Sequence, residues 1–234
     1  MLRTRRSFLR SAAAVALLAA SLAVPAGAAL AQQGAAPRPA QAPAGELLGD
    51  ARVPFSADRT LTVNGRTFSG RVYHTPGRQR HEQMLEGIQQ VVILRADHAQ
   101  GWLVVPSLKS YVEFVFPRAV AELSDPSLRG APLGQETVNG VRTTKHRVEH
   151  TARDGTTADG YLWVSAEGIV MRLDGEVRGK GNGGKPTPFS MELSNVRVGA
   201  QDAGLFDLPP GYMKLPANAL QPLLGGIAGG MSKG

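Results

Sequence analysis

Apolar and polar residues alternate in short runs along most of the chain, a pattern typical of β-strands rather than helices. The runs are rich in Val, Ile, Thr, Tyr and Phe, and Gly or Asn-Gly separates many of them, as between 55–63 and 66–73. Asn64 and Gly65 accept the positive φ angles of a type I′ turn. About ten such runs lie between residues 55 and 198. Because tight turns join antiparallel neighbours, the pattern predicts a mainly β protein built on an antiparallel sheet.

Four central runs have apolar residues at both odd and even positions, instead of at alternate positions only. They lie at 91–94, 102–105, 111–115 and 161–164. Since adjacent strand residues point to opposite faces, both faces of the middle of the sheet must be kept from water. Three arrangements would do this: a closed barrel, a sheet bent around its own cavity under a thin lid, or a partner or ligand. Two short helical patterns, at 117–123 and from 217 onward, are the candidates for a lid.

An export signal is predicted at the N-terminus, over residues 1–31. Arg5 and Arg6 are followed by Phe-Leu, a further Arg and an apolar run of 13 residues at 12–24. This order resembles the twin-arginine (Tat) signal peptide of bacteria. The run is shorter than the roughly 20 residues that span a bilayer, so no transmembrane span is expected in the mature chain. We expect cleavage near Ala31, with Ala28 as the second choice, and a periplasmic location.

Composition divides the remaining chain and excludes several classes of protein. Residues 32–49 are a flexible leader rich in Ala, Pro and Gln, 50–215 form the β domain, and 216–234 are an apolar, Gly-rich tail. Four of the 26 Lys and Arg residues lie in the signal, which leaves 22 against 19 Asp and Glu and a net charge of +3. Such a balance does not favour nucleic-acid binding. A sequence without cysteine excludes disulfides, thiolate metal sites and a Cys nucleophile.

Two patterns suggest chemistry, and each has a simpler structural explanation. His146 and His150 would stand about 13 Å apart on one face of a strand, too far to share a metal ion. The Gly-rich run at 179–185 precedes Pro186, where a phosphate-binding loop requires Ser or Thr. The sequence contains no Gly-x-Ser-x-Gly elbow. We therefore expect no metal, no cofactor and no enzyme activity.

Three groups of segments together resemble LolA-like proteins, the outer-membrane lipoprotein carrier-like superfamily. The first group is ILRAD at 93–97, GWLVVP at 101–106 and KSYVE at 109–113; the second is ETVNG at 136–140, TKH at 144–146 and GYLWV at 160–164; the third is LFDLPPGY at 205–212. The third group contains the Phe-x-x-Pro-x-Gly-Tyr ending common in that superfamily. The resemblance covers roughly residues 50–215 and is to an uncharacterised periplasmic branch.

This resemblance implies a strongly curved antiparallel half-barrel, with short helices as a thin lid over an apolar cavity. Carrier members of the superfamily hold lipoprotein acyl chains in that cavity, and sensor and lipid-handling relatives use the same shell for other apolar partners. The carriers' functional residues have no assigned positions in this sequence. The expected ligand is therefore a lipid, an acyl chain or a lipoprotein-like apolar group in general.

Large apolar side chains of the central strands are the candidate ligand contacts. They are Trp102, Val104, Tyr111, Phe114, Tyr161, Trp163, Met171 and Met191. Alternation places Tyr161 and Trp163 on one face and Leu162 on the other, but the sequence does not indicate which face is concave. Two alternatives to non-enzymatic ligand binding stay open. One is an envelope protein-interaction or sensor module that uses the same groove or the C-terminal tail, and the other is a hydrolase acting on envelope lipids.

Overall fold

The computed structural model describes residues 42–43, 50–85, 87–115, 129–151, 155–179 and 184–216, and their strands form a single sheet. The strands of the first half are β1 (Ala42–Pro43), β2 (Phe55–Val63), β3 (Arg66–Thr75), β4 (Arg78–Leu85), β5 (Ile88–Arg95), β6 (Gln100–Val105) and β7 (Ser110–Val115). Those of the second half are β8 (Arg129–Val138), β9 (Val141–Thr151), β10 (Thr157–Ser165), β11 (Val170–Arg178), β12 (Pro186–Val198) and β13 (Met213–Lys214). Three short 3-10 turns accompany them: η2 (Ala96–His98), η3 (Pro106–Leu108) and η5 (Ala203–Phe206).

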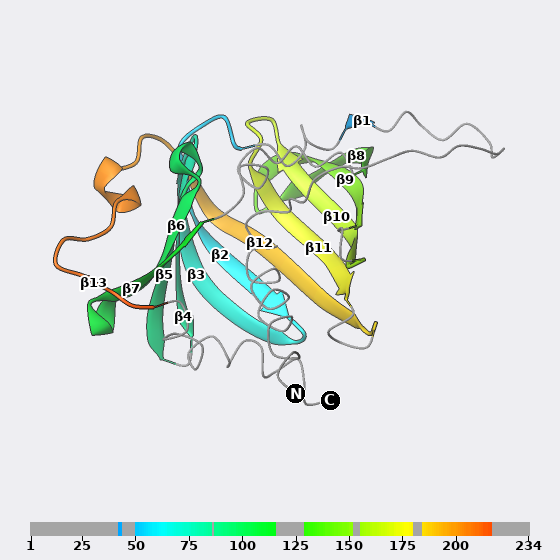
Figure 1. The fold of residues 1–234 in the computed structure, drawn as a ribbon. Helices are drawn as coiled ribbons and strands as arrows, with labels where there is room; N and C mark the ends of the chain where they lie inside the picture. The colour runs from blue at the N-terminus through cyan, green and yellow to red at the C-terminus, as the bar shows by residue number, and fades with distance from the viewer. Residues whose placement is uncertain are drawn as a thin grey trace, which may run out of the picture.

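The mainly β, antiparallel architecture predicted from the sequence is confirmed. The strand order is β1-β8-β9-β10-β11-β12-β2-β3-β4-β5-β6-β7-β13, so the pairing of β12 with β2 joins two meanders into one sheet (Figure 1). All neighbours pair antiparallel except β13, which runs parallel to β7. The two end strands, β1 and β13, do not pair with each other, so the sheet that the structure describes is open rather than a closed barrel.

The predicted Asn-Gly hairpin has the expected geometry. Asn64 and Gly65 between β2 and β3 have φ angles of 49° and 77°. Asn139 and Gly140 between β8 and β9 repeat this pair, with φ angles of 46° and 80°. Positive φ at both central positions is the requirement of a type I′ turn. The local sequence therefore sets the register of both hairpins.

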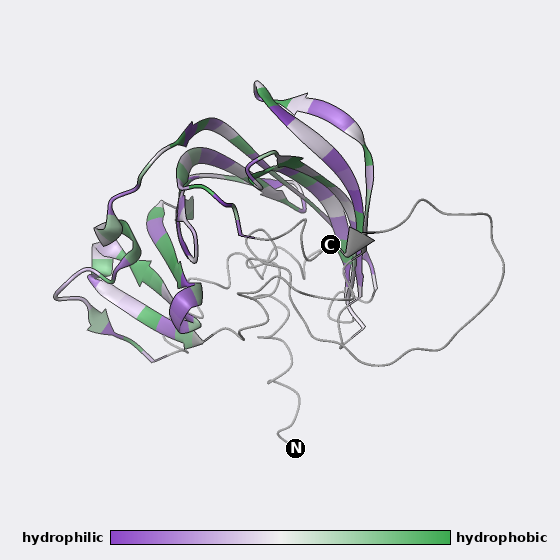
Figure 2. Ribbon diagram, turned by 90° about the horizontal axis from the view of Figure 1, so that it is seen from above, coloured by the Kyte–Doolittle hydropathy of each residue, from purple (hydrophilic) through white to green (hydrophobic). Residues whose placement is uncertain are grey.

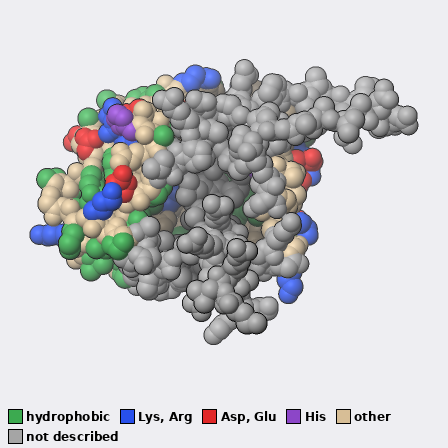
Figure 3. Space-filling model, in the orientation of Figure 1, with side chains coloured by type: hydrophobic (Ala, Val, Ile, Leu, Met, Phe, Trp, Pro, Cys, Tyr) green, Lys and Arg blue, Asp and Glu red, His purple; other side chains and the backbone are tan. Residues whose placement is uncertain are grey.

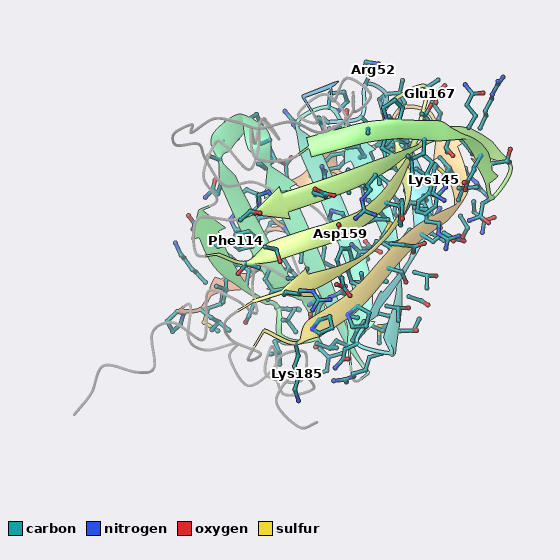
Figure 4. All side chains as sticks on the ribbon, turned by 90° about the vertical axis from the view of Figure 1, so that its right-hand side faces the viewer. Arg52, Phe114, Lys145, Asp159, Glu167 and Lys185 are labelled. Atoms are coloured by element: carbon teal, nitrogen blue, oxygen red, sulfur yellow. The ribbon has the colours of Figure 1, made fainter. Side chains whose placement is uncertain are left out.

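The sheet bends into an open arc with a concave and a convex face (Figure 2). Residues directly opposite in antiparallel strands share a face, and Leu162, Leu173, Met191 and Leu61 follow one another in this way across β10, β11, β12 and β2. Figure 4 views the outside of the arc at β9–β11, where Lys145 and Asp159 lie. Asp159 and Leu162 are three positions apart on β10, so their side chains point to opposite faces. Leu162 and its cross-strand row therefore belong to the concave face.

The C-terminal part of the β domain covers the convex face of β5 and β6. Val91, Ile93 and Val104 are buried there, and Leu208 and Tyr212 pack against them. The turn η5 lies against β4 and β5, and its Phe206 is fully buried. These contacts explain why β5 and β6 are apolar on both faces, because a segment of the same chain covers the outer one.

The predicted lid helices, at 117–123 and from 217 onward, lie outside the described residues, as do the export signal and all of the tail except Pro216. Within the described ranges the only helical elements are 3-10 turns. Two residues of the predicted leader, Ala42–Pro43, form β1 and pair with β8. The described part of the chain holds no helix with the length and hydropathy to cross a membrane.

Candidate functional site

The eight candidate residues divide between the two faces of the sheet. Phe114, Met171 and Met191 lie on the concave face, whereas Trp102, Val104, Tyr111, Tyr161 and Trp163 lie on the convex face. The strand register assigns residues to the faces, because paired residues share a face. Phe114 pairs with Gly101, which pairs in turn with Leu94, whereas Val104 pairs with both Val91 and Tyr111. Strand alternation thus separates residues that composition alone groups together.

On the convex face, long cationic side chains cover the aromatic rings of β10. The Nζ atom of Lys145 lies 4.8 Å from the ring centroid of Trp163 and 5.0 Å from that of Tyr161. The guanidinium of Arg172, which pairs with Trp163 from β11, lies 4.9 Å from the Trp163 centroid. Trp163 Nε1 donates a hydrogen bond of 2.6 Å to Glu136, and the residue is only 5% exposed. Aliphatic stems therefore shield this outer apolar surface, which indicates a structural role for Trp163.

The concave face carries two apolar areas. The larger lies on β10–β12 and β2 and is built from buried aliphatic and Met side chains, which include Leu162, Met171, Leu173, Met191 and Leu61. The smaller lies on β5–β7, where Leu103, Val105 and Val112 are buried and Val92 and Phe114 pack against them. Met is unbranched and polarisable, which suits a surface that must adapt to apolar groups of different shape.

A buried cation, Arg59, stands between these two apolar areas. The concave side of β2 consists of Phe55, Ala57, Arg59, Leu61 and Val63, and all five are buried. Arg59 faces Gly70 of β3, and Gly70 in turn faces Gln83 of β4. Because Gly70 has no side chain, the guanidinium can extend across β3 towards β4.

Neutral groups hold the Arg59 guanidinium. Its Nη1 atom lies 2.9 Å from Nδ1 of His81, and its Nη2 donates to Oε1 of Gln83 at 3.1 Å. Since Arg can only donate, Nδ1 of His81 accepts the hydrogen bond from Arg59. Nε2 of His81 therefore carries the proton and donates a hydrogen bond to Oε1 of Gln79 at 3.1 Å. This arrangement requires the neutral form of His81.

Burial shifts the pKa of both groups in the direction that disfavours charge. It lowers the pKa of Arg59 to about 10. Burial, and then the charges of Arg59 and His74, hold the pKa of His81 well below its usual value. Arg59 stays cationic at neutral pH, so the apolar concave face contains a buried positive charge next to a neutral imidazole.

Among the described residues, His74 is paired with a carboxylate but is not placed as in a Ser-His-Asp triad. His74 is bonded at Nε2 to Asp50 (2.6 Å) and at Nδ1 to the carbonyl oxygen of Val53 (3.1 Å). A Ser-His-Asp triad needs that second nitrogen for the nucleophile's hydroxyl. No group of three or more His, Asp or Glu side chains within the described ranges could hold a metal ion.

Sequence reasoning did not single out Arg59, although a signal for it exists. In an alternating strand the positions 55, 57, 61 and 63 are apolar, and Arg59 is the one charged residue in their phase. A charge in the buried phase of a strand marks either a buried ion pair or a binding group. The sequence cannot distinguish these, because the partners come from β4.

No protein-family model matches the chain, and no curated protein matches it. Solved structures with a similar fold include an uncharacterized conserved protein from Thermus thermophilus, with 11% identity and a TM-score of 0.47 over 74% of this chain and 93% of that chain. The MucA/MucB complex structure from Pseudomonas aeruginosa is similar with 18% identity and a TM-score of 0.45, over 68% of this chain and 56% of that chain. They also include the LolA superfamily protein NE2245 from Nitrosomonas europaea, with 7% identity and a TM-score of 0.37 over 70% of this chain and 94% of that chain.

Proposed function

We propose that this protein is exported to the periplasm and binds a lipid, an acyl chain or a lipoprotein-like apolar ligand on the concave face of its open sheet, without catalysing a reaction. The export part of the proposal rests on the arginine pair and the apolar run of the N-terminal segment. The binding part rests on the structure of the sheet. Burial of apolar ligand surface, at about 25 cal/mol for each Å², would supply the affinity.

The observation that carries the proposal is a difference between the two faces. On the convex face, described parts of the chain cover the apolar surface: Leu208 and Tyr212 over β5 and β6, and Lys145 and Arg172 over Trp163. On the concave face, the described residues supply no second sheet and no helical layer over the two apolar areas, and Leu215 of the C-terminal segment packs against the smaller one (Figure 2). The concave face is therefore the surface on which a ligand would find apolar contacts.

Phe114 and Tyr111 offer a matched test, because both are half-buried aromatic residues of β7 that point to opposite faces. We predict that Phe114→Ala weakens binding of a fluorescent fatty acid about threefold to tenfold, since an apolar contact is lost. Tyr111→Ala on the convex face should leave the affinity within about twofold of the wild type. Titration by fluorescence gives both values, and circular dichroism confirms that both variants fold. Equal losses in the two variants would contradict a ligand site on the concave face.

A hydrophobic surface at the end of the sheet is a separate feature. Figure 3 shows hydrophobic side chains where η3 and β13 lie, and Leu108 and Met213 of these elements are 55% and 63% exposed. Leu108 lies in the connection between β6 and β7, and Met213 lies in the edge strand β13. We assign them no part in ligand binding.

A further inference from the structure

We propose that Arg59 is the headgroup site of an acidic amphiphile, so that the ligand of the concave face carries a single carboxylate or phosphate at one end of an apolar chain. This inference rests on the function proposed above and specifies the class of ligand.

The first argument is the contrast between the two buried arginines of the described residues, Arg59 and Arg95, which are 7% and 9% exposed. Arg95 lies between two carboxylates: its Nη2 donates to Asp97 and its Nη1 to Asp207, each at 2.8 Å. Arg59 is bonded to His81 and Gln83, both neutral, and no carboxylate of the described residues forms an ion pair with it. A buried cation without a counter-charge is costly, and an anionic group of a ligand would offset that cost.

The second argument is the hydrogen-bonding capacity that remains. A guanidinium has five N–H donors in a planar fork, and the bonds to His81 and Gln83 occupy two of its nitrogens. Carboxylate and phosphate oxygens match that fork and accept two parallel hydrogen bonds from it. The neutral His81 and the amides of Gln79 and Gln83 add no negative charge that would repel an anion.

The third argument is the position of Arg59 between apolar areas. The cross-strand row through Arg59 has Leu193 on one side and Gly70, Gln83 and Gln90 on the other. Beyond these residues lie the apolar area of β10–β12 on one side and that of β5–β7 on the other. An anion at Arg59 would therefore have apolar surface on both sides for the chain attached to it, which a small free anion would not use.

The test compares cis-parinaric acid with its methyl ester at pH 7.5, since the two probes share a chain and differ in charge. We expect the wild type to bind the acid at least about tenfold more tightly than the ester. Arg59→Met should reduce this preference to about twofold or less by weakening the acid alone. Arg172→Met, which removes a cation from the convex face, should retain the full preference.

The outcomes separate this inference from the proposed function. Equal affinity of the wild type for acid and ester would overturn the headgroup site while leaving apolar binding intact, and binding of neither probe would contradict the proposed function itself. Inorganic phosphate that raises the Tm of the wild type, without any preference for the acid, would assign Arg59 to a free anion and also overturn the inference. If Arg59→Met does not fold, the acid-to-ester ratio of the wild type decides alone.

Discussion

Gly70 determines where the Arg59 side chain can lie. It sits between Arg59 and Gln83 in the strand row, and a Cβ atom at this position would lie 2.0 Å from the carbonyl oxygen of Glu82. The backbones of β3 and β4 approach each other too closely there for any side chain. A single glycine thus allows both the close strand contact and the path of the guanidinium.

We predict that Gly70→Ala lowers the free energy of unfolding by about 1–3 kcal/mol, because the added methyl group forces the two strands apart. Ser69→Ala, at the exposed neighbouring position, should change it by less than about 0.5 kcal/mol. Urea unfolding followed by circular dichroism measures both. Equal stability of the two variants would show that the strands tolerate the methyl group.

His81 predicts a dependence of stability on pH. Its pKa in the folded protein is held well below the usual 6.5 by burial and by the charges of Arg59 and His74, so the unfolded chain takes up a proton that the native protein excludes. Stability is therefore complete above about pH 6.5 and falls as the pH decreases below it, by up to about 1.4 kcal/mol for each pH unit. Burial acts in the same direction on the pKa of His146.

Unfolding measured between pH 7.5 and pH 5 should show this loss in the wild type and a smaller loss in His81→Gln. His98→Gln is the control, because that side chain is 59% exposed. A pH dependence that stays unchanged in His81→Gln would assign the loss to other groups.

At the scale of elements, the C-terminal segment from η5 to β13 packs against the convex face. Phe206 is fully buried beside β4 and β5, and Asp207 accepts a hydrogen bond from Arg95. These residues come from two of the three groups of motifs that resemble LolA-like proteins, and Arg95 and Asp207 are 112 residues apart in sequence. The motifs therefore meet in space as one structural contact.

We predict that Phe206→Ala lowers the free energy of unfolding by roughly 3–5 kcal/mol, the range for loss of a buried Phe. Asp207→Asn should cost no more than about 1 kcal/mol, because its carboxylate is 61% exposed and water screens the ion pair. Chemical denaturation gives both values. A loss in Asp207→Asn as large as that in Phe206→Ala would show that charge rather than packing holds the segment.

The elements were largely predictable from the sequence, whereas their partners were not. Alternation and Asn-Gly turns indicated the run of antiparallel strands from β2 to β12, because both signals act locally, although β8 begins earlier than its pattern indicated. The two-residue strands β1 and β13 are defined by pairing with distant strands and leave no pattern of their own. For the same reason the runs apolar on both faces showed that a cover was needed without identifying the C-terminal segment as that cover.

At the scale of the whole molecule, curvature decides which apolar face is available. Alternation correctly separated Trp163 from Leu162, but the direction of the bend follows from the packing of all strands together and has no local signature. Phe114, Met171 and Met191 lie on the concave face, and the five other candidates lie on the convex face. Size and hydrophobicity alone therefore identified three of the residues proposed to contact ligand and none of the polar group around Arg59.

The measurement that tests the central proposal most directly is native mass spectrometry of the mature protein, purified from a bacterial periplasm without strong detergent. We predict a stoichiometric adduct that disappears after organic extraction, and lipid analysis of the extract should identify an acidic amphiphile. A bare mass, together with no uptake of added fluorescent fatty acid, would contradict binding on the concave face and favour a protein-interaction module instead.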